Sequence, residues 1–328
     1  MSGLKMKKIS IHFDCDTGQD DAIALLYALG SEKINVKSIS VVGGNVDVEQ
    51  CAYNTLQILE LAGRQDIPVF IGADKPIKRS LKNLPEVFGI TGMAGAEDLP
   101  IPVTQPIRSP EIMKSMMINQ STLVATAPLT NLALNIQKNQ IFKKHINHII
   151  MMGGCVFPEP IHNRLGNFMA DGATDYAEYN FAVDPEAAKI VFASGVENIS
   201  LIGLNVTRSV LYNHEIENSL LKCNNFCASR AAKILSSVGE EDLVDYASVK
   251  ADASDPVRAL HDIVAMVAVD HPEIFIFEEV PIRIRLDKAA GQTIIDNINP
   301  DHTKVRVAVN VNKPAFYNTF IDTIRRLP

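Results

Sequence analysis

The fold of this chain is decided by one stretch near its start, Ile9-Ser10-Ile11-His12-Phe13-Asp14-Cys15-Asp16-Thr17-Gly18-Gln19-Asp20-Asp21. Its alternating apolar residues predict a β-strand, and the pattern from Asp20 onward predicts an α-helix. The glycine turn between them carries four carboxylates within eight positions. Four anions this close repel one another unless a cation or a shared proton compensates. The crowding indicates a hard metal ion, which takes oxygen ligands.

Helix capping explains only part of this acidic stretch. Asp20 and Asp21 stand where carboxylates cap free N–H groups and complement the helix dipole, which leaves two aspartates unexplained. An EF-hand loop needs Gly at its sixth position and Glu at its twelfth. Counted from Asp14, those positions hold Gln19 and Leu25. The Gly-rich run of a P-loop is missing as well.

Composition limits the class of protein. The chain has 328 residues, 47% of them apolar, without a low-complexity tract or linker, so we expect one domain over residues 1–328. A net charge of −7 without a basic cluster argues against a nucleic-acid partner. No apolar run is long enough for a signal peptide or a membrane span. The five cysteines lack the close pairing of a zinc ribbon. We expect a soluble, cytoplasmic protein with reduced thiols.

Strand and helix patterns alternate through the first two-thirds of the chain. After the first strand, strands are predicted at residues 36–42, 68–71, 121–125, 148–152 and 199–202, and helices at 22–29, 47–63, 129–139 and 184–195. This alternation predicts an α/β fold, an open, mostly parallel twisted sheet with helices on both faces.

The remaining segments are less regular. Further helices are predicted from Ser109-Pro110, over 214–238, over 256–269 and at the C-terminus, and late strands over 280–285 and 305–309. Two long stretches, 73–106 and 155–179, show no clear periodicity. Loops of this length in compact domains are usually functional or mobile.

Polar residues follow several of the predicted strands. They are Asp14 and Asp16, Asn45, Thr126 and the turn Met152-Gly153-Gly154. In open α/β sheets the ligand binds beyond the carboxyl ends of the strands, at a topological switch point. We therefore expect these residues to meet at one edge of the sheet and form a site.

The same residues resemble the signature of a known family, the nucleoside hydrolases. Asp-Cys-Asp-Thr-Gly-Gln-Asp-Asp-Ala after an apolar strand is similar to that signature, with Thr17 in place of its usual proline. Further matches follow in order over nearly the whole chain: Val42-Gly43-Gly44-Asn45, Ala125-Thr126-Ala127-Pro128-Leu129-Thr130-Asn131, Met151-Met152-Gly153-Gly154, Ala177-Glu178-Tyr179-Asn180 with Asp184-Pro185-Glu186-Ala187-Ala188, and His261-Asp262.

The resemblance implies a calcium-dependent hydrolase of ribonucleosides. Asp16, Asp21 and Asp262 would supply carboxylates to Ca²⁺, and Thr126 its backbone carbonyl. This all-oxygen set suits Ca²⁺. The ion would lower the pKa of the attacking water, and Asp16 would remove its proton as general base.

The resemblance also implies which residues hold the sugar. Asp20, Asn45, Asn167, Glu178 and Asn180 would bind the ribose hydroxyls, and Met152 would lie beneath the ring. The family's short form has its asparagine six residues before the glutamate, where this chain has Gly172. Asn167 follows a glycine, as in the longer form of the loop, and therefore takes this role.

The leaving base is where the signals conflict. The eleven-residue spacing from Asn167 to Glu178 resembles the purine-preferring branch, which grips the base between tryptophans, yet this chain has no tryptophan. Phe88 stands where a base-side histidine is usual. His261 resembles the broad-specificity branch, in which an imidazolium protonates the departing base. The hypothesis is that both purine and pyrimidine ribonucleosides are hydrolysed, with His261 as acid; a packed, structural His261 is the alternative. The family also implies a homodimer or homotetramer.

Two other readings remain open at this stage. A haloacid-dehalogenase-like phosphatase also opens with Asp-x-Asp after a strand, but it needs Thr four residues after the first Asp, where this chain has Gly18. A non-catalytic nucleoside or ribose sensor would keep the pocket. Its binding function would not require a base such as Asp16.

Overall fold

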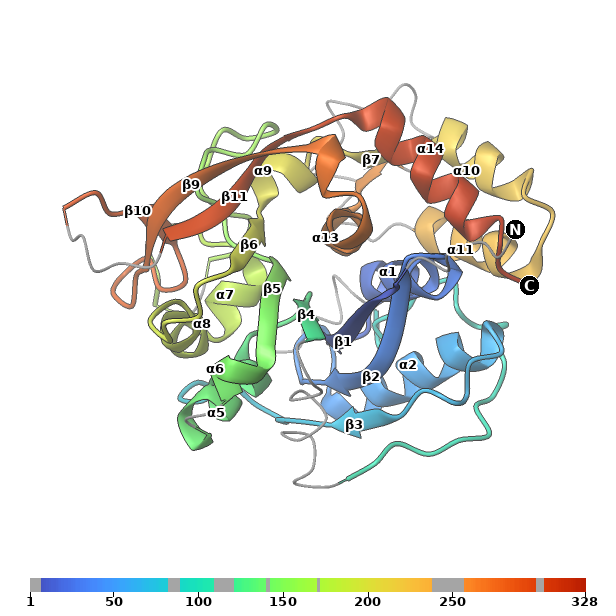
Figure 1. The fold of residues 1–328 in the computed structure, drawn as a ribbon, viewed down its shortest axis with the longest axis horizontal. Helices are drawn as coiled ribbons and strands as arrows, with labels where there is room; N and C mark the ends of the chain where they lie inside the picture. Colours follow the sequence, from blue (N-terminus) through green and yellow to red (C-terminus); the bar gives the residue numbers. More distant parts are fainter. Residues whose placement is uncertain are drawn as a thin grey trace.

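The computed structural model describes residues 7–81, 89–108, 121–139, 142–169, 172–237, 257–298 and 304–328. In these ranges, nine strands form one sheet in the order β10-β9-β11-β6-β5-β4-β1-β2-β3 (Figure 1). The strands are β1 Ile9–Cys15, β2 Ile34–Val41, β3 Val69–Ile71, β4 Ser121–Ala125, β5 Ile146–Met152, β6 Ile199–Ile202, β9 Phe275–Ile284, β10 Thr293–Ile295 and β11 Lys304–Val311.

The sheet is open and mostly parallel, as the sequence predicts. All neighbours from β3 to β11 pair in parallel, while β9 pairs antiparallel with both β11 and β10. The chain builds outward from β1 through β2 to β3 and then returns to add β4 on the other side of β1. The switch point of the topology therefore lies between β1 and β4, where a ligand site is expected.

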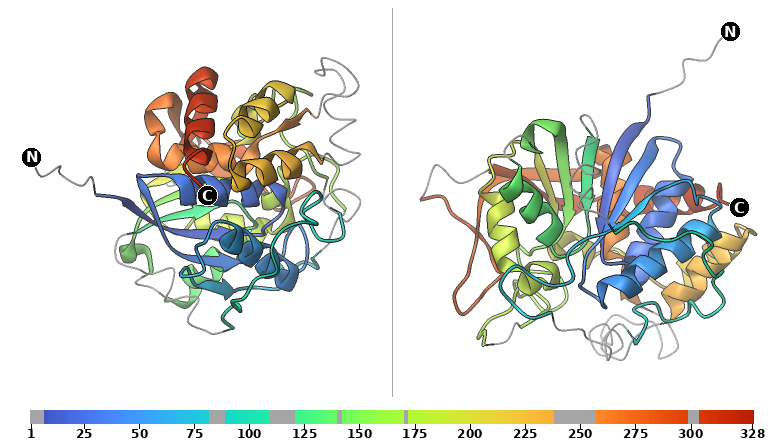
Figure 2. Two further views of the ribbon diagram at one scale, coloured as in Figure 1. Left: turned by 90° about the vertical axis from the view of Figure 1, so that its right-hand side faces the viewer. Right: turned by 90° about the horizontal axis from the view of Figure 1, so that it is seen from below.

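Helices cover both faces of the sheet (Figure 2). One face carries α1 Gln19–Gly30, α2 Val48–Leu61, α10 His214–Leu221, α11 Phe226–Ser236, α13 His261–Asp270 and α14 Lys313–Ile324, and the other carries α5 Thr130–Lys138 and α8 Pro185–Phe192. Short helices α6 Phe142–His145, α7 Tyr179–Val183 and α9 Leu204–Thr207, the 3-10 turn η2 Pro272–Ile274 and the small ribbon β7 Leu211–Tyr212 with β8 Arg258–Ala259 complete the described elements. None of these helices has the length and apolar character needed to cross a lipid bilayer.

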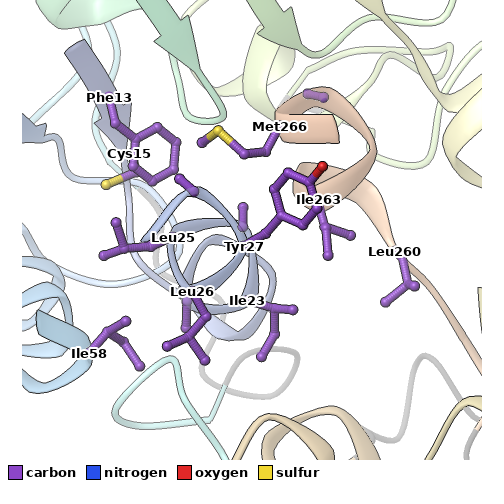
Figure 3. Close-up of a cluster of buried hydrophobic side chains, with 14 of the residues drawn as sticks. Phe13, Cys15, Ile23, Leu25, Leu26, Tyr27, Ile58, Leu260, Ile263 and Met266 are labelled. Carbon is purple, nitrogen blue, oxygen red and sulfur yellow. The ribbon is translucent and has the colours of Figure 1, made fainter. Parts of the chain in front are cut away.

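Strand alternation divides the apolar residues into two cores. In β4, Val124 belongs to the core under α1 and α13, whereas Leu123 and Ala125 belong to the core under α5 and α8. Successive strand side chains point to opposite faces, which produces this division. Figure 3 shows α1 between β1 and α13, with Leu25 on the side of Cys15 and Tyr27 on the side of Ile263. α1 is thereby buried almost throughout, and its start is fixed at the switch point.

The structure corrects several predicted boundaries. The region 214–238 is two helices, because Asn224 adopts a positive φ of 55° and Asn225 caps a new helix at Ala228 N. The helix expected over 256–269 begins only at His261, since residues 258–259 form β8 instead. Strand β10 and helix α7 were not predicted. The helix start expected at Ser109-Pro110, and residues 238 and 256 of two predicted helices, lie outside the described ranges.

Candidate active site

The acidic turn between β1 and α1 is closed by hydrogen bonds from two loops. The backbone N–H of Gly18 donates to Asp21 Oδ2 at 3.1 Å, so Asp21 folds back over the start of its own helix. The backbone N–H of Asn45, after β2, donates to Asp16 Oδ2 at 2.8 Å. The side-chain amide of Asn45 also lies 3.4 Å from Asp21 Oδ2. Asn45 therefore holds both carboxylates in place.

Gly44 allows this loop to approach Asp16 closely. A Cβ added at Gly44 would lie 1.9 Å from Asp16 Oδ2, so any larger residue would displace the Asp16 carboxylate. The Gly44 carbonyl accepts a hydrogen bond from the Tyr179 hydroxyl at 3.2 Å. This bond joins the loop that holds Asp16 to helix α7, which starts at Tyr179.

Thr126 and Asn180 extend the site across the ends of β4 and β5. The Thr126 hydroxyl donates to Asp21 Oδ1 at 2.6 Å. Asn180 Nδ2 donates to the Thr126 carbonyl at 3.0 Å and lies 3.4 Å from the Met152 carbonyl and 3.6 Å from Met152 Sδ. The polar residues that follow the strands thus meet at one edge of the sheet, as the parallel topology predicts.

Among the described residues, Glu178 and Asn167 are hydrogen-bonded to the start of α7 rather than to the acidic turn. Glu178 caps α7, because its carboxylate accepts hydrogen bonds from two backbone N–H groups of that helix and, at 2.9 Å, from the backbone of Gly154. Asn167 Oδ1 accepts a hydrogen bond from the Tyr179 backbone N–H at 3.0 Å. Helix α7 links these two predicted sugar-binding residues to the acidic turn, because Tyr179 contacts Gly44 and Asn180 contacts Thr126.

Asp20 joins the start of α1 to the start of α13. Its Oδ2 accepts a hydrogen bond from the His261 backbone N–H at 3.3 Å, and its Oδ1 lies 3.4 Å from Arg258 Nη2. The His261 ring is held by a 2.8 Å contact between Nδ1 and Thr207 Oγ1. Asp262 is buried in the first turn of α13, near enough to the acidic turn for the charges of Asp21, Asp20 and Asp16 to raise its pKa. The start of α13, which carries the predicted residues His261 and Asp262, is thereby joined to the start of α1, which carries Asp20 and Asp21.

The arrangement agrees with comparisons to known proteins. The family model described as inosine-uridine preferring nucleoside hydrolase matches residues 11–318. The chain belongs to this family. The expected enzyme class is thereby confirmed.

Relatives of this nucleoside hydrolase match it over nearly their whole length. It is 35% identical over 312 residues to the pyrimidine-specific ribonucleoside hydrolase RihA of Photobacterium profundum, covering 92% of this chain and 94% of the relative. It is 27% identical over 327 residues to an inosine-uridine preferring nucleoside hydrolase of Leishmania major, covering 97% and 98%. A solved structure of a purine-preferring ribonucleoside hydrolase from Gardnerella vaginalis superposes with a TM-score of 0.82 at 26% identity, covering 96% and 98%. The fold prediction is confirmed.

The carboxylates of this nucleoside hydrolase are buried together, which makes their ionisation costly. Burial raises the pKa of Asp16 and of Asp262 well above the usual range, and the charge of Asp21 raises both further. Burial also raises the pKa of Asp20, which the charge of Arg258 opposes. The site is short of positive charge.

The chemistry of this donor set suits a hard cation. Asp16, Asp21, Asp262 and the Thr126 carbonyl offer only oxygen, and three of these four groups are anionic when deprotonated. Within the described ranges, no three His, Cys, Asp or Glu side chains are already grouped so that they could hold a metal ion.

Asp14, the first aspartate of the motif, is hydrogen-bonded to residues of the neighbouring elements. Its Oδ1 accepts hydrogen bonds from Asn131 Nδ2 at 2.8 Å and from the Ser40 hydroxyl, which also contacts His12 Nε2 at 2.9 Å. Its backbone carbonyl accepts a hydrogen bond from the Thr126 N–H at 3.0 Å. Burial raises the pKa of Asp14 to about 7. Asp14 thus ties β1 to β2 and to the loop after β4.

Sequence reasoning missed Arg258, Gly44 and Tyr179 as individual site residues. Gly44 and Tyr179 lie inside the motifs Val42–Asn45 and Ala177–Asn180, where the signal was available. Arg258 has no local signal, because its partners lie at the opposite end of the chain. Phe88, noted for the base side of the pocket, lies outside the described residues.

Proposed function

We propose that this nucleoside hydrolase cleaves the N-glycosidic bond of ribonucleosides to free base and ribose, with Asp16 as general base. The observation that carries the proposal is the meeting of Asp16, Asp21 and Asp262 at the switch point of the sheet. Cleavage of this bond builds positive charge on the sugar, which buried carboxylates stabilise.

Each group then has a defined task. The oxygen of a water bonds to the anomeric carbon while the carbon–nitrogen bond breaks and its electron pair moves to the base. Asp16 takes the proton of the water. His261 gives a proton to the departing base, and both residues then return to their starting state by exchange with solvent.

We propose Ca²⁺ as the cation of the site, held by Asp16, Asp21, Asp262 and the Thr126 carbonyl. When bound, it would offset the charge of the carboxylates and make water more acidic. The support is chemical, since the set is all oxygen and lacks positive charge. In the same proposal Asp20, Asn45, Asn167, Glu178 and Asn180 hold the ribose hydroxyls over Met152, and the chain acts as a homodimer or homotetramer.

We propose that both purine and pyrimidine ribonucleosides are substrates. The named relatives divide between pyrimidine-specific, inosine-uridine preferring and purine-preferring enzymes. The chain has no tryptophan to sandwich a purine, while His261 stands beside Asp262 and can assist either class of base. An acid that protonates the leaving group needs few contacts with a particular base.

A reducing-sugar assay over a panel of ribonucleosides tests the proposal. Release of ribose from members of both base classes supports it. Release of phosphate from sugar phosphates with Mg²⁺, without ribose release, would instead identify a phosphatase. Binding of ribonucleosides without any turnover would identify a sensor.

Replacement of the base tests the role of Asp16. Asp16→Asn keeps the shape of the side chain, and we expect it to keep the fold and nucleoside binding while kcat falls by ~10²–10⁴. Asp66→Asn is the matched control, because Asp66 is an exposed aspartate that pairs with Arg64 on the surface. If Asp16→Asn keeps more than about a tenth of the activity, Asp16 is not the base.

A further inference from the structure

Arg258 places a buried guanidinium at the edge of the acidic site. Only 10% of its side chain is exposed. Its Nη1 donates to Gln19 Oε1 at 2.9 Å, and its Nη2 lies 3.4 Å from Asp20 Oδ1. Gln19 and Asp20 are the first two residues of α1. Because a guanidinium presents its donors in a rigid planar fork, these two contacts fix one side chain relative to the other.

Gln19 gives Arg258 an immobile partner. Its Nε2 lies 3.0 Å from the Ala94 carbonyl, 2.9 Å from the Ile234 carbonyl and 2.8 Å from the Ser237 carbonyl. A primary amide has two N–H groups, so these three acceptors share them. The amide nitrogen is anchored to the loop after residue 89 and to the end of α11, which leaves Oε1 aimed at Arg258.

Asp20 uses its two oxygens differently. Oδ2 accepts the His261 backbone N–H, which is one of the free donors at the start of α13. The residue before that helix, Leu260, has no side chain that can cap it, so Asp20 caps α13 from another helix. Oδ1 is buried and accepts no hydrogen bond within the described residues. Arg258 faces this oxygen and leaves it able to accept a hydrogen bond from a ligand.

We propose that Arg258 is a positioning residue that acts through Asp20. With Gln19 it holds Asp20 so that one oxygen caps α13, which carries His261 and Asp262, and the other accepts a ribose hydroxyl. The inference rests on the proposed ribonucleoside hydrolysis and adds the residue that sets its recognition of ribose over deoxyribose.

The test compares Arg258→Met, Arg258→Lys and wild type on a ribonucleoside and on its 2′-deoxy and 3′-deoxy analogues. Met keeps the length and apolar stem of the side chain but removes charge and donors. We expect Arg258→Met to lower kcat/KM for the ribonucleoside about tenfold or more. The preference over at least one deoxy analogue should fall with it, because that analogue lacks the hydroxyl that Asp20 accepts. Arg258→Lys should recover part of the loss, since it restores the charge without the fork.

Two controls separate positioning from general destabilisation. Arg283→Met removes an arginine of β9 that pairs with Asp296, and should leave both kcat/KM and the ribose preference unchanged. The double variant Asp20→Asn with Arg258→Met should be no worse than Asp20→Asn alone, since the two residues act as one unit.

The outcomes distinguish the inference from the function on which it rests. A lower Tm with an unchanged ribose preference would show that Arg258 is merely structural. Additive losses in the double variant, or a ribonucleoside kcat/KM within twofold of wild type in Arg258→Met, would overturn the inference while the hydrolase function stands. If wild type releases no ribose from any ribonucleoside, the proposed hydrolase function and the inference about Arg258 are both refuted.

Discussion

Replacing Gly44 by alanine should disable Asp16 although Asp16 itself is unchanged. The added Cβ would lie 1.9 Å from Asp16 Oδ2, whereas ordinary contact begins at 3.4 Å, so this oxygen has to move by about 1.5 Å. The move also breaks the 2.8 Å hydrogen bond from the Asn45 N–H. A misplacement of ~1 Å in a catalytic group can cost ~10²-fold in rate, and we expect kcat/KM to fall by about that factor.

The effect on stability should be smaller than the effect on catalysis. The φ of Gly44 lies outside the left-handed region, so alanine fits the backbone there without strain. Overpacking by one methyl costs about 1–3 kcal/mol, which lowers Tm but leaves the protein folded. The clash involves the Asp16 side chain, which can rotate. We therefore expect the Asp16 carboxylate to move while the backbone of the sheet stays in place.

The assay is ribose release under saturating and subsaturating nucleoside, with Tm measured on the same preparations. Gly30→Ala is the matched control, because its Cβ would meet the Thr323 backbone oxygen at 2.6 Å at the far end of α1. It should lower Tm and leave kcat/KM unchanged. A Gly44→Ala enzyme whose kcat/KM stays within threefold of wild type would refute the reasoning.

Three further outcomes are expected. His261→Ala should lose ~10²–10⁴ in kcat/KM on inosine and uridine but much less on a nitrophenyl riboside, whose leaving group needs no proton; equal losses on both would assign His261 to packing. Chelation should abolish ribose release and lower Tm, with recovery on added Ca²⁺, and elemental analysis that finds zinc or no metal in an active preparation would contradict this. Burial lowers the pKa of His12 to about 3, so between pH 6.5 and 3 the unfolded chain binds more protons and stability falls as pH falls. By pH 5 this should cost about 2 kcal/mol, and the stability of His12→Asn, measured by urea unfolding, should depend less steeply on pH over that range; equal slopes would contradict it.

The first strand and its turn could be predicted because their signals are local. Alternating apolar residues mark β1, and the glycine turn with Asp20 and Asp21 marks the start of α1. The meeting of Asp16, Asn45 and Thr126 also followed, since the carboxyl ends of parallel strands share one edge. These inferences need no knowledge of distant contacts.

The start of α13 could not be predicted, because its cap is not local. Leu260 gives no capping signal, and Asp20 supplies the missing acceptor from α1. The same distance hides Arg258, whose hydrogen bond to Gln19 spans 239 positions. The break after α10 is different, because two adjacent asparagines, Asn224 and Asn225, mark it in the sequence.

The geometry of the two helices explains why the fold tolerates so many buried carboxylates. Asp20 and Asp21 lie in the first turn of α1, and Asp262 lies in the first turn of α13. The N-terminus of a helix carries a partial positive charge and free N–H donors, so both helices direct positive potential at the same cluster. Their packing against each other in the core of Figure 3 holds these two ends together. Arg258 adds a full positive charge beside Asp20. The helix ends and Arg258 therefore offset part of the cost of burying these carboxylates, which is the setting that Asp16 needs in its proposed role as base.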